Sequence, residues 1–240
     1  MTAMPHTAFI MAAGLGTRMR PLTNTTPKPL IEVAGRSIID RLLDALVAAG
    51  VGRAIVNVHW LADQMETHLA GRTDIEIIIS DERDELLETG GGLAKARPLL
   101  GEDPVFIVNA DVLWSPGDAA PLAALAEAYD PGAMDELLLL ADLGRCLGFP
   151  GAGDFFRSDD GALARRGDAP SAPWAYAGVR IANPQTFHDL PVEKFSANRL
   201  WEPMIAARRL HGLPLDGFWL HIGDPGALAD AEMWLRCHGA

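Results

Sequence analysis

The chain begins with an apolar run, at residues 8–13, in which no polar residue alternates with the apolar ones. A strand that is buried on both faces has this pattern, so the run predicts a central strand of a parallel sheet. Three later runs, at 54–59, 75–79 and 105–109, are rich in Val and Ile and predict further strands. The first strand leads into a glycine-rich turn.

Helical periodicity separates these strands. Apolar residues recur at helical spacing over 38–47, with Ser37 at the position of an N-terminal cap and Gly50 just past the end. Segments 61–69 and 90–100 predict two more helices. The alternation predicts an α/β fold, a Rossmann-like mixed but mostly parallel sheet flanked by helices, with ligands beyond the carboxyl ends of the strands.

The second half of the chain is less regular. It predicts two strands and two closing helices, at 137–141, 174–181, 196–211 and 225–237. Short strands and loops rich in Gly, Asp, Arg and Pro are expected between them, and we interpret 144–195 as a lid or insert over the sheet. No internal repeat occurs, so residues 1–240 are expected to form one domain.

The composition narrows the class of protein. Hydrophobic residues make up 49% of the 240, enough for a substantial core, and 20 basic against 32 acidic residues give a net charge of −12. This charge opposes binding to phosphate backbones, so no nucleic-acid partner is expected. Cys146 and Cys237 are too few for a disulfide framework. The apolar stretch at 9–13 follows no basic residue and is too short to span a bilayer, so we expect no membrane partner and a cytoplasmic location.

A basic, glycine-rich loop after the first strand is the strongest chemical signal. Gly14 and Gly16 let backbone N–H groups approach a phosphate without obstruction by a side chain. Arg18, Arg20 and Lys28 bring cations to the same loop of an otherwise acidic protein. The combination predicts a polyphosphate site, and the alternative is a glycine turn with solvated charges.

Two other phosphate-binding motifs do not fit this loop. The dinucleotide fingerprint needs Gly or Ala where the chain has Met19, and an acid at the end of the second strand, where it has Asn57 and His59. The P-loop needs a Gly-Lys pair, which occurs nowhere in the sequence.

Two further features point to the same edge of the sheet. Asp111 follows the strand at 105–109, where a carboxylate facing a triphosphate can hold Mg²⁺; the alternative is a turn or cap aspartate. Gly90 and Gly91 begin a predicted helix, where backbone can lie against a flat nucleobase and Glu88 can accept a proton from it. An ordinary glycine-rich helix entry is the alternative there.

Motifs spread along the chain resemble the signature of the sugar-1-phosphate nucleotidyltransferases. They are the loop at 14–23, Pro27-Lys28-Pro29-Leu30 with 31–35, Leu87-Glu88-Thr89-Gly90-Gly91-Gly92, Asn109-Ala110-Asp111, Tyr176-Ala177-Gly178-Val179, 195–201 and Trp219-Leu220-His221-Ile222-Gly223-Asp224-Pro225. Within this family the chain is most similar to the N-acetylmuramate-1-phosphate uridylyltransferases of cell-wall recycling, followed by the mannose-1-phosphate guanylyltransferases. The resemblance implies the nucleotide-diphospho-sugar transferase type of α/β fold.

The resemblance also implies roles for the matching residues. The catalytic residues are Arg18, Lys28 and Asp111. The nucleotide is bound by Ala13, Gly14, Gly16, Thr17, Glu88, Gly90, Gly91 and Asn109. The resemblance further implies that the lid or insert at 144–195 binds the sugar. The sugar-binding residues are Tyr176, Gly178 and Trp201, although core packing is the better interpretation of Trp174 and Trp201. The cofactor is Mg²⁺, held by Asp111 together with Asp224 or His221.

Two departures from the family pattern matter. The family supplies a second Asp where this chain has His221, and imidazole is a poor Mg²⁺ ligand, so Asp224, water or a phosphate contact of His221 are the open alternatives. The Glu-Lys-Pro segment whose lysine meets the sugar phosphate is missing. Arg165 or Arg166 is a substitute, unless the two form a solvated basic pair.

The expected reaction transfers a nucleotidyl group from an NTP, with UTP favoured, to a sugar 1-phosphate, with N-acetylmuramate 1-phosphate favoured, and releases pyrophosphate. These two substrates are the expected partners of a monomer or small homo-oligomer. The alternatives are a mannose-1-phosphate guanylyltransferase that makes GDP-mannose, a choline-phosphate cytidylyltransferase and a non-catalytic sugar-nucleotide-binding regulatory subunit. A glycosyltransferase usually has Asp-x-Asp where this chain has only Asp111.

Overall fold

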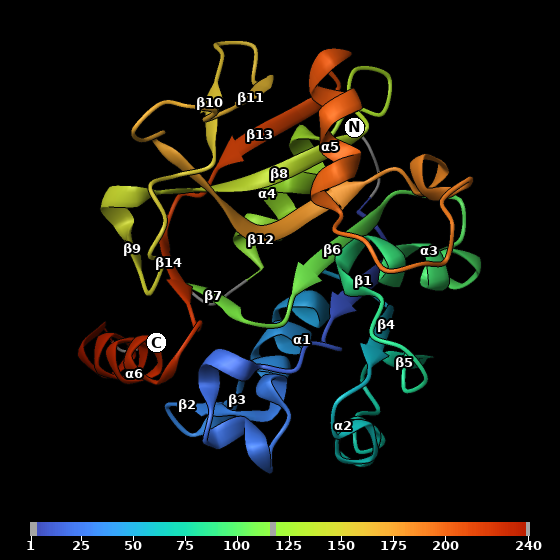
Figure 1. The fold of residues 1–240 in the computed structure, drawn as a ribbon, viewed down its shortest axis with the longest axis vertical. Helices are drawn as coiled ribbons and strands as arrows, with labels where there is room; N and C mark the ends of the chain where they lie inside the picture. Colours follow the sequence, from blue (N-terminus) through green and yellow to red (C-terminus); the bar gives the residue numbers. More distant parts are fainter. Residues whose placement is uncertain (1–3, 116–118, 239–240) are drawn as a thin grey trace.

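A mixed sheet crosses the centre of the molecule (Figure 1). The computed structural model describes residues 4–115 and 119–238. The strands of the sheet are β1 (Thr7–Met11), β4 (Arg53–Val58), β5 (Glu76–Asp81), β6 (Val105–Asn109), β8 (Glu136–Asp142), β10 (Phe155–Arg157), β11 (Leu163–Arg165), β12 (Trp174–Ala182) and β13 (Leu210–Pro214). They pair in the order β11-β10-β12-β6-β1-β4-β5, with β8 on β12 and β13 on β8.

The direction of the strands divides the sheet into two parts. β6, β1, β4 and β5 are parallel, with Ala8 opposite both Ala54 and Phe106. β12 runs antiparallel to β6 and to β8, while β13 is parallel to β8. The predicted mixed, mostly parallel α/β sheet is therefore confirmed, and the antiparallel strands come from the second half of the chain.

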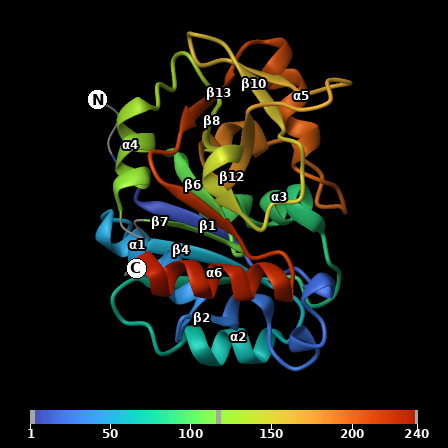
Figure 2. The same cartoon turned by 90° about the vertical axis from the view of Figure 1, so that its left-hand side faces the viewer.

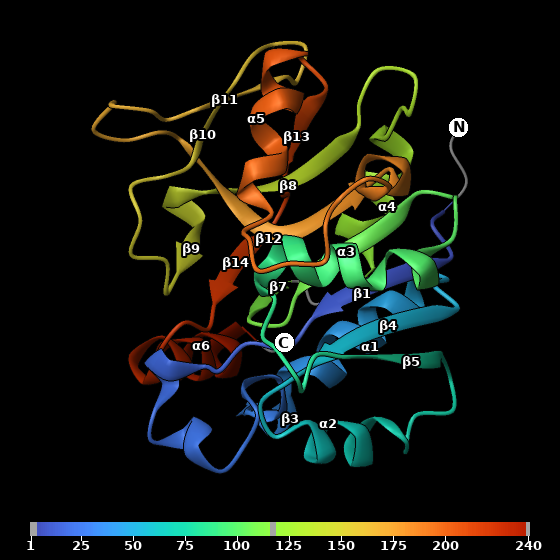
Figure 3. The ribbon, with the colours of Figure 1, turned by 45° about the vertical axis from the view of Figure 1, so that its right-hand side comes forward.

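Helices cover both faces of the sheet. They are α1 (Ile38–Ala48), α2 (Ala62–Leu69), α3 (Glu88–Leu100), α4 (Ala120–Ala128), α5 (Asn198–Ala206) and α6 (Pro225–His238). On one face Ile10 packs in a core with Leu42 of α1; on the other, Phe9 packs with Leu93 of α3. Neighbouring residues of β1 thus point to opposite cores, which explains its unbroken apolar pattern. Figure 3 shows α3 beside the strands β1 and β4.

Two small sheets complete the fold. β7 (Val112–Ser115), β14 (Phe218–His221) and β9 (Cys146–Leu147) pair in the order β7-β14-β9, and β2 (Glu32–Val33) pairs with β3 (Arg36–Ser37). Figure 2 shows α6, which follows β14, lying beside β2. The 3₁₀ turns are η1 (Thr17–Met19), η2 (Leu22–Asn24), η3 (Lys28–Leu30), η4 (Leu143–Arg145) and η5 (Pro184–Phe187).

The closing helix predicted at 196–211 is wrong in its second half. The helix α5 ends at Ala206, Arg208 takes a left-handed conformation with φ 56°, and Leu210 starts β13. Leu210 is completely buried, so parallel pairing with β8 and burial outweigh helix propensity here. The helix α4 was not predicted, because its segment has no polar residue between positions 119 and 126 to mark an exposed face.

The segment at 144–195 contains β9, the hairpin β10-β11 and β12 (Figure 1); the hairpin forms one edge of the large sheet, β12 lies inside that sheet, and β9 pairs in the small sheet with β14. Its expected function as a lid stays a prediction, as does the expected single domain. Among the described residues, no helix is both long enough and apolar enough to cross a membrane.

Candidate active site

A cavity of about 460 Å³ opens at the carboxyl ends of β1 and β6. Its wall consists of Met11, Ala12, Ala13, Gly14, Gly16, Thr17, Arg18, Lys28, Pro29, Asn57, Leu86, Glu88, Thr89, Asn109, Ala110, Asp111, Ser196 and Gly223. The structure thus brings the predicted phosphate loop, Glu88, Asn109 and Asp111 to one site. This is the edge where parallel strands of an open α/β sheet present ligand sites.

The glycine loop has an open side and a closed side. A Cβ atom on Gly14 would meet no atom within 4 Å, so its backbone is freely accessible. Gly16 has φ +59°, and a Cβ there would lie 2.8 Å from Cγ2 of Thr23. The hydroxyl of Thr23 donates to the Gly16 carbonyl at 2.8 Å. Only glycine fits position 16, and the turn it makes starts η1, which carries Thr17 and Arg18.

Lys28 reaches across the cavity to Asp111. Its Nζ lies 2.7 Å from Oδ2 of Asp111, and the two side chains are only 12% and 24% exposed. Burial favours a raised pKa of Asp111, but the His221 imidazole and the Lys28 ammonium outweigh it and hold the pKa well below its usual range. Asp111 is therefore ionised at neutral pH beside two nitrogen groups.

His221 is brought to Asp111 by the second sheet. β14 pairs antiparallel with β7, His221 lies opposite Val112, and the backbone N–H of Ile222 donates to the Asp111 carbonyl at 2.8 Å. Nε2 of His221 lies 3.7 Å from Oδ2 of Asp111. Asp224 is instead exposed and accepts a hydrogen bond from the backbone N–H of Ala227 at 3.0 Å, as a cap of α6. Of the two residues predicted to complete the metal site, His221 lies beside Asp111, whereas Asp224 caps α6.

The donor set fits a divalent ion that also binds phosphate. Asp111 and His221 supply an oxygen and a nitrogen, and among the described residues no group of three or more His, Cys, Asp or Glu side chains is placed to hold a metal. Mg²⁺ in nucleotide enzymes is held by one or two protein carboxylates, with phosphates and water as the other ligands. Asp111 would supply one such carboxylate here, and the second protein donor would be the nitrogen of His221.

Asn57 and Glu82 form a buried bridge that the sequence analysis did not assign to the site. Oδ1 of Asn57 accepts hydrogen bonds from the backbone N–H groups of Ala12 and Ala13, at 2.6 and 3.2 Å. Its Nδ2 donates to Oε1 of Glu82 at 2.7 Å, and Oε2 of Glu82 accepts from Leu87 N at 3.2 Å. The start of the glycine loop is thus tied to the start of α3. A polar residue within the apolar run at 54–58 was the signal that could have indicated this bridge.

The backbone N–H of Ala13 is therefore occupied, although the residue lines the cavity as predicted. Gly90 and Gly91 do not line it. Their N–H groups donate to the Phe195 carbonyl at 2.8 and 3.3 Å, and a Cβ on either would clash with residues 193–195. The glycines allow close packing of that segment against α3.

Glu88 enters the cavity wall with an unusual backbone. Its φ is 60°, a left-handed conformation that is rare for a residue with a side chain. Its carboxylate lies 3.8 Å from Nζ of Lys194. Such conformations are often found at functional sites.

The predicted sugar residues lie on and behind β12. Gly178 has φ +81°, and a Cβ there would lie 2.7 Å from Val112. The Tyr176 hydroxyl accepts a hydrogen bond from Arg180 at 3.0 Å, and Arg180 pairs with Glu136 at 2.9 Å. Trp201 is 4% exposed and donates from Nε1 to Glu136 at 2.7 Å. Trp201 is therefore a core residue, and it does not form an exposed platform for a sugar.

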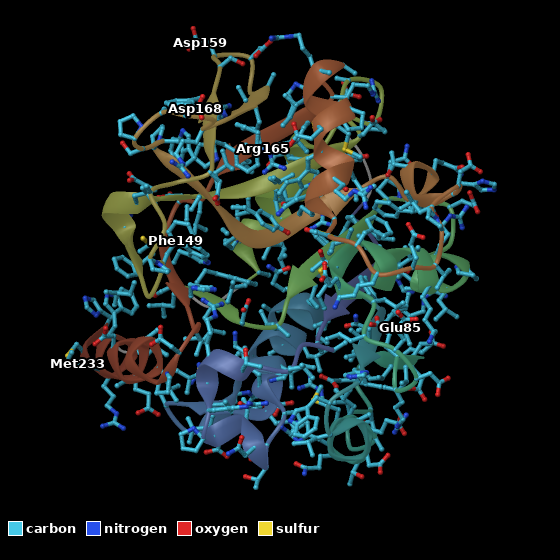
Figure 4. The ribbon with its side chains drawn as sticks, viewed as in Figure 1. Glu85, Phe149, Asp159, Arg165, Asp168 and Met233 are labelled. Atoms are coloured by element: carbon cyan, nitrogen blue, oxygen red, sulfur yellow. The ribbon has the colours of Figure 1, made fainter. Side chains whose placement is uncertain are left out.

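The two arginines proposed as substitutes for the family lysine do not line the cavity. Arg166 donates to the carbonyls of Gly153 and Ala169. Arg165, beside α5 in Figure 4, pairs with Glu202 and lies over the ring of Trp201. Both arginines act as structural contacts of the hairpin.

The chain is similar to known proteins over most of its length. Residues 7–139 match the family model of the nucleotidyl transferases. The chain is 47% identical over 236 residues to the N-acetylmuramate alpha-1-phosphate uridylyltransferase of Caulobacter vibrioides, covering 97% of this chain and 98% of that protein. It is 32% identical over 227 residues to the mannose-1-phosphate guanylyltransferase catalytic subunit beta of Drosophila pseudoobscura, covering 91% of this chain and 59% of that longer protein.

The fold is shared more widely still. HddC from Yersinia pseudotuberculosis superposes with a TM-score of 0.77 at 20% identity, covering 96% of this chain and 99% of HddC. The chain therefore belongs to the nucleotidyl transferase family and is an enzyme of that class.

Proposed function

We propose that this protein transfers the uridylyl group of UTP to N-acetylmuramate 1-phosphate and releases pyrophosphate. The observation that carries the proposal is the 47% identity over nearly the full length of both chains to an enzyme with this name. The cavity supports it, because the phosphate loop, Lys28 and Asp111 face one space. We further propose a cytoplasmic enzyme that returns a cell-wall sugar to use as a nucleotide sugar.

The reaction needs no nucleophilic side chain. An oxygen of the sugar phosphate attacks the α-phosphorus of UTP, a P–O bond forms, and the bond to the leaving pyrophosphate breaks. Catalysis is then positioning and neutralisation of phosphate charge. The backbone at Gly14, Gly16 and Thr17 holds phosphate oxygens, and Arg18 binds the β- and γ-phosphates. Lys28, which lines the same cavity, is assigned to the α-phosphate or the sugar phosphate.

The other assigned residues orient the substrates. Glu88 and the loop near Ala13 border the space for the base, with Asn109 beside Asp111 at the end of β6. Tyr176, held by Arg180, and the backbone of Gly178 are assigned to the sugar side. Asp111, with His221 beside it, holds a divalent ion, and such an ion when bound supplies charge neutralisation at the phosphate oxygens.

The test is a pyrophosphate-release assay with purified protein. Each of UTP, GTP, CTP and ATP is combined with N-acetylmuramate 1-phosphate, N-acetylglucosamine 1-phosphate, mannose 1-phosphate and choline phosphate, with Mg²⁺ or Mn²⁺. We expect kcat/KM for UTP with N-acetylmuramate 1-phosphate to exceed that of every other pair by about tenfold or more. An Asp111→Asn variant is the inactive control.

Other outcomes of this assay would replace the proposal. A preference for GTP with mannose 1-phosphate would assign the guanylyl activity that names the Drosophila pseudoobscura relative. Binding of nucleotide sugars by calorimetry without turnover of any pair would assign a regulatory subunit.

A further inference from the structure

We infer that His221 makes the metal site of this protein a mixed oxygen and nitrogen site, which binds a first-row divalent transition ion such as Mn²⁺ in preference to Mg²⁺. The inference rests on the proposed function in one respect, that a metal-bound nucleotide occupies this cavity. It is otherwise carried by the contacts that hold the imidazole.

The hydrogen bond to one ring nitrogen fixes the tautomer of His221. Nδ1 lies 3.0 Å from the carbonyl oxygen of Gly148, which can only accept, so Nδ1 carries a proton. A ring that is protonated only at Nδ1 has a lone pair on Nε2, and this is the form that a metal ion binds. A histidine whose other nitrogen donates to a backbone carbonyl is the usual arrangement of a metal ligand.

The surroundings of the ring keep Nε2 directed at Asp111. Trp219 and Phe149 pack against the imidazole, with ring centroids 5.7 and 6.3 Å away. Phe149, labelled in Figure 4, lies on the segment that follows β9. A Cβ on Gly223 would lie 2.9 Å from Cε1 of His221, so glycine is needed there for the ring to occupy this place.

Gly148 is equally restricted. It has φ +75°, and a Cβ would lie 2.1 Å from the His221 carbonyl oxygen. A residue with a side chain would displace the carbonyl that fixes the tautomer. The backbone on both sides of His221 is thus arranged for this one ring position.

The separation of the two donors suits a shared ion. Nε2 of His221 lies 3.7 Å from Oδ2 of Asp111, and neighbouring ligands of one octahedral ion with bonds of about 2.1 Å are roughly 3 Å apart. Because the imidazole is held in place, movement of the Asp111 side chain has to close the difference. Lys28 shares Oδ2 of Asp111, so binding of an ion at this oxygen requires the ammonium to move away, as to a phosphate oxygen of the bound nucleotide.

The chemistry of the donors sets the preference. Mg²⁺ favours oxygen ligands and near-ideal octahedral geometry, whereas first-row transition ions accept imidazole nitrogen readily. Exchanging a carboxylate for an imidazole removes a negative charge, which weakens binding of Mg²⁺ more than that of an ion that bonds to nitrogen. The neighbouring carboxylate, Asp224, does not compensate, because it caps α6.

The experiment measures the metal ligand directly. Mn²⁺ is bound to the full chain with a non-hydrolysable UTP analogue, and pulsed electron paramagnetic resonance records nitrogen hyperfine coupling. Titration against Mg²⁺ gives the ratio of the two affinities. We expect nitrogen coupling in the wild-type complex and a ratio of at least about tenfold in favour of Mn²⁺.

Two variants complete the test. His221→Asp should lose the coupling and lower the Mn²⁺ to Mg²⁺ ratio by about tenfold. His188→Gln removes an exposed histidine that pairs with Asp189, and it should match the wild type. Circular dichroism tests whether both variants fold. If His221→Asp does not fold, the paramagnetic resonance spectrum of the wild-type complex still decides whether nitrogen binds the ion.

The inference is overturned if the wild-type complex has no nitrogen coupling, or if folded His221→Asp keeps the wild-type affinity ratio. Either result leaves uridylyl transfer standing when pyrophosphate is released from UTP and N-acetylmuramate 1-phosphate. Nitrogen coupling together with no turnover of any pair supports the metal preference and refutes the proposed reaction.

Discussion

Lys28 and Asp111 are 83 residues apart in the sequence, and their side chains meet with Nζ and Oδ2 2.7 Å apart. Each charge compensates the other in the part-buried wall of the cavity. The pair joins the phosphate loop to the end of β6, so it places a cation and a carboxylate at the same point of the proposed substrate site.

Lys28→Ala should lower kcat/KM for nucleotidyl transfer by about 10²- to 10³-fold, because a preorganised cation at the phosphates is lost. Steady-state pyrophosphate release measures this effect. Lys95→Ala is the matched control, since Lys95 lies on α3 and donates to the Asp81 carbonyl outside the cavity wall. Near-full activity of folded Lys28→Ala would remove Lys28 from the catalytic residues.

Glu82→Gln should weaken nucleotide binding without removing a group from the cavity wall. Both carboxylate oxygens of Glu82 accept hydrogen bonds, one from Asn57 Nδ2 and one from Leu87 N. The side-chain nitrogen of a glutamine at this position would have to face one of these two donors. Relief by a flip of the Asn57 amide would turn its nitrogen toward Ala12 and Ala13. The loss of one buried hydrogen bond corresponds to about 1–3 kcal/mol, which converts to a rise in Kd of roughly 5- to 100-fold.

Calorimetry with a non-hydrolysable UTP analogue measures this Kd. Glu85→Gln, on the exposed segment labelled in Figure 4, is the control. An unchanged Kd in folded Glu82→Gln would refute the bridge as a positioning device.

Arg180→Met should destabilise the fold strongly. Arg180 and Glu136 are almost completely buried, and removing one partner of a buried ion pair costs about 3–5 kcal/mol. Burial already raises the pKa of Glu136 in spite of the arginine. Arg180→Met with Glu136→Leu should recover much of the loss, which urea denaturation measures. A loss in the double variant as large as in Arg180→Met would contradict this account.

Gly178→Ala should lower the free energy of unfolding by more than the roughly 1–2 kcal/mol of a left-handed backbone, because its Cβ also meets both methyl groups of Val112. Gly167 has φ +55°, and a Cβ there would meet open space. Gly167→Ala therefore measures the cost of the left-handed backbone alone. Thermal and urea unfolding compare the two. Combination with Val112→Ala should give less than the sum of the single effects; strict additivity would show that no clash exists.

Asp40 makes the stability of the protein depend on acid pH. Burial favours a raised pKa, but hydrogen bonds from Ser37 and His68 and the charge of Arg72 outweigh it, so the folded pKa lies below the usual value. The stabilisation is therefore present above the unfolded pKa of about 3.9 and is lost as the pH falls through the lower, folded pKa.

Asp40→Asn should lower the free energy of unfolding by about 1 kcal/mol at neutral pH, because the carboxylate lies in the first turn of α1. The difference from the wild type should shrink as urea unfolding is repeated from pH 7 down to about pH 3. Asp103→Asn, at an exposed position, should follow the wild type throughout. A constant difference for Asp40→Asn would show that the charge is not responsible.

The sequence predicted the parts of this structure that depend on local patterns. Residues that are close together in the sequence determine three such features. These are the burial of β1 on both faces, the N-terminal cap of α1 and the accessible backbone at Gly14. β13 and the Asn57–Glu82 bridge depend on segments far apart in the sequence, whose pairing no local pattern encodes. The same holds for Gly90, whose environment is formed by Phe195. His221 was recognised as a departure, but only the β7–β14 pairing places it beside Asp111 rather than in a loop.

The β7–β14 pairing also has a consequence for biosynthesis. The ribosome releases the phosphate loop and Asp111 early, whereas the strand that brings the imidazole to that carboxylate is among the later segments to be translated. A chain that has been synthesised only as far as Asp111 still lacks this histidine and also Gly223, which lines the cavity. Assembly of the full wall is thus coupled to completion of the polypeptide.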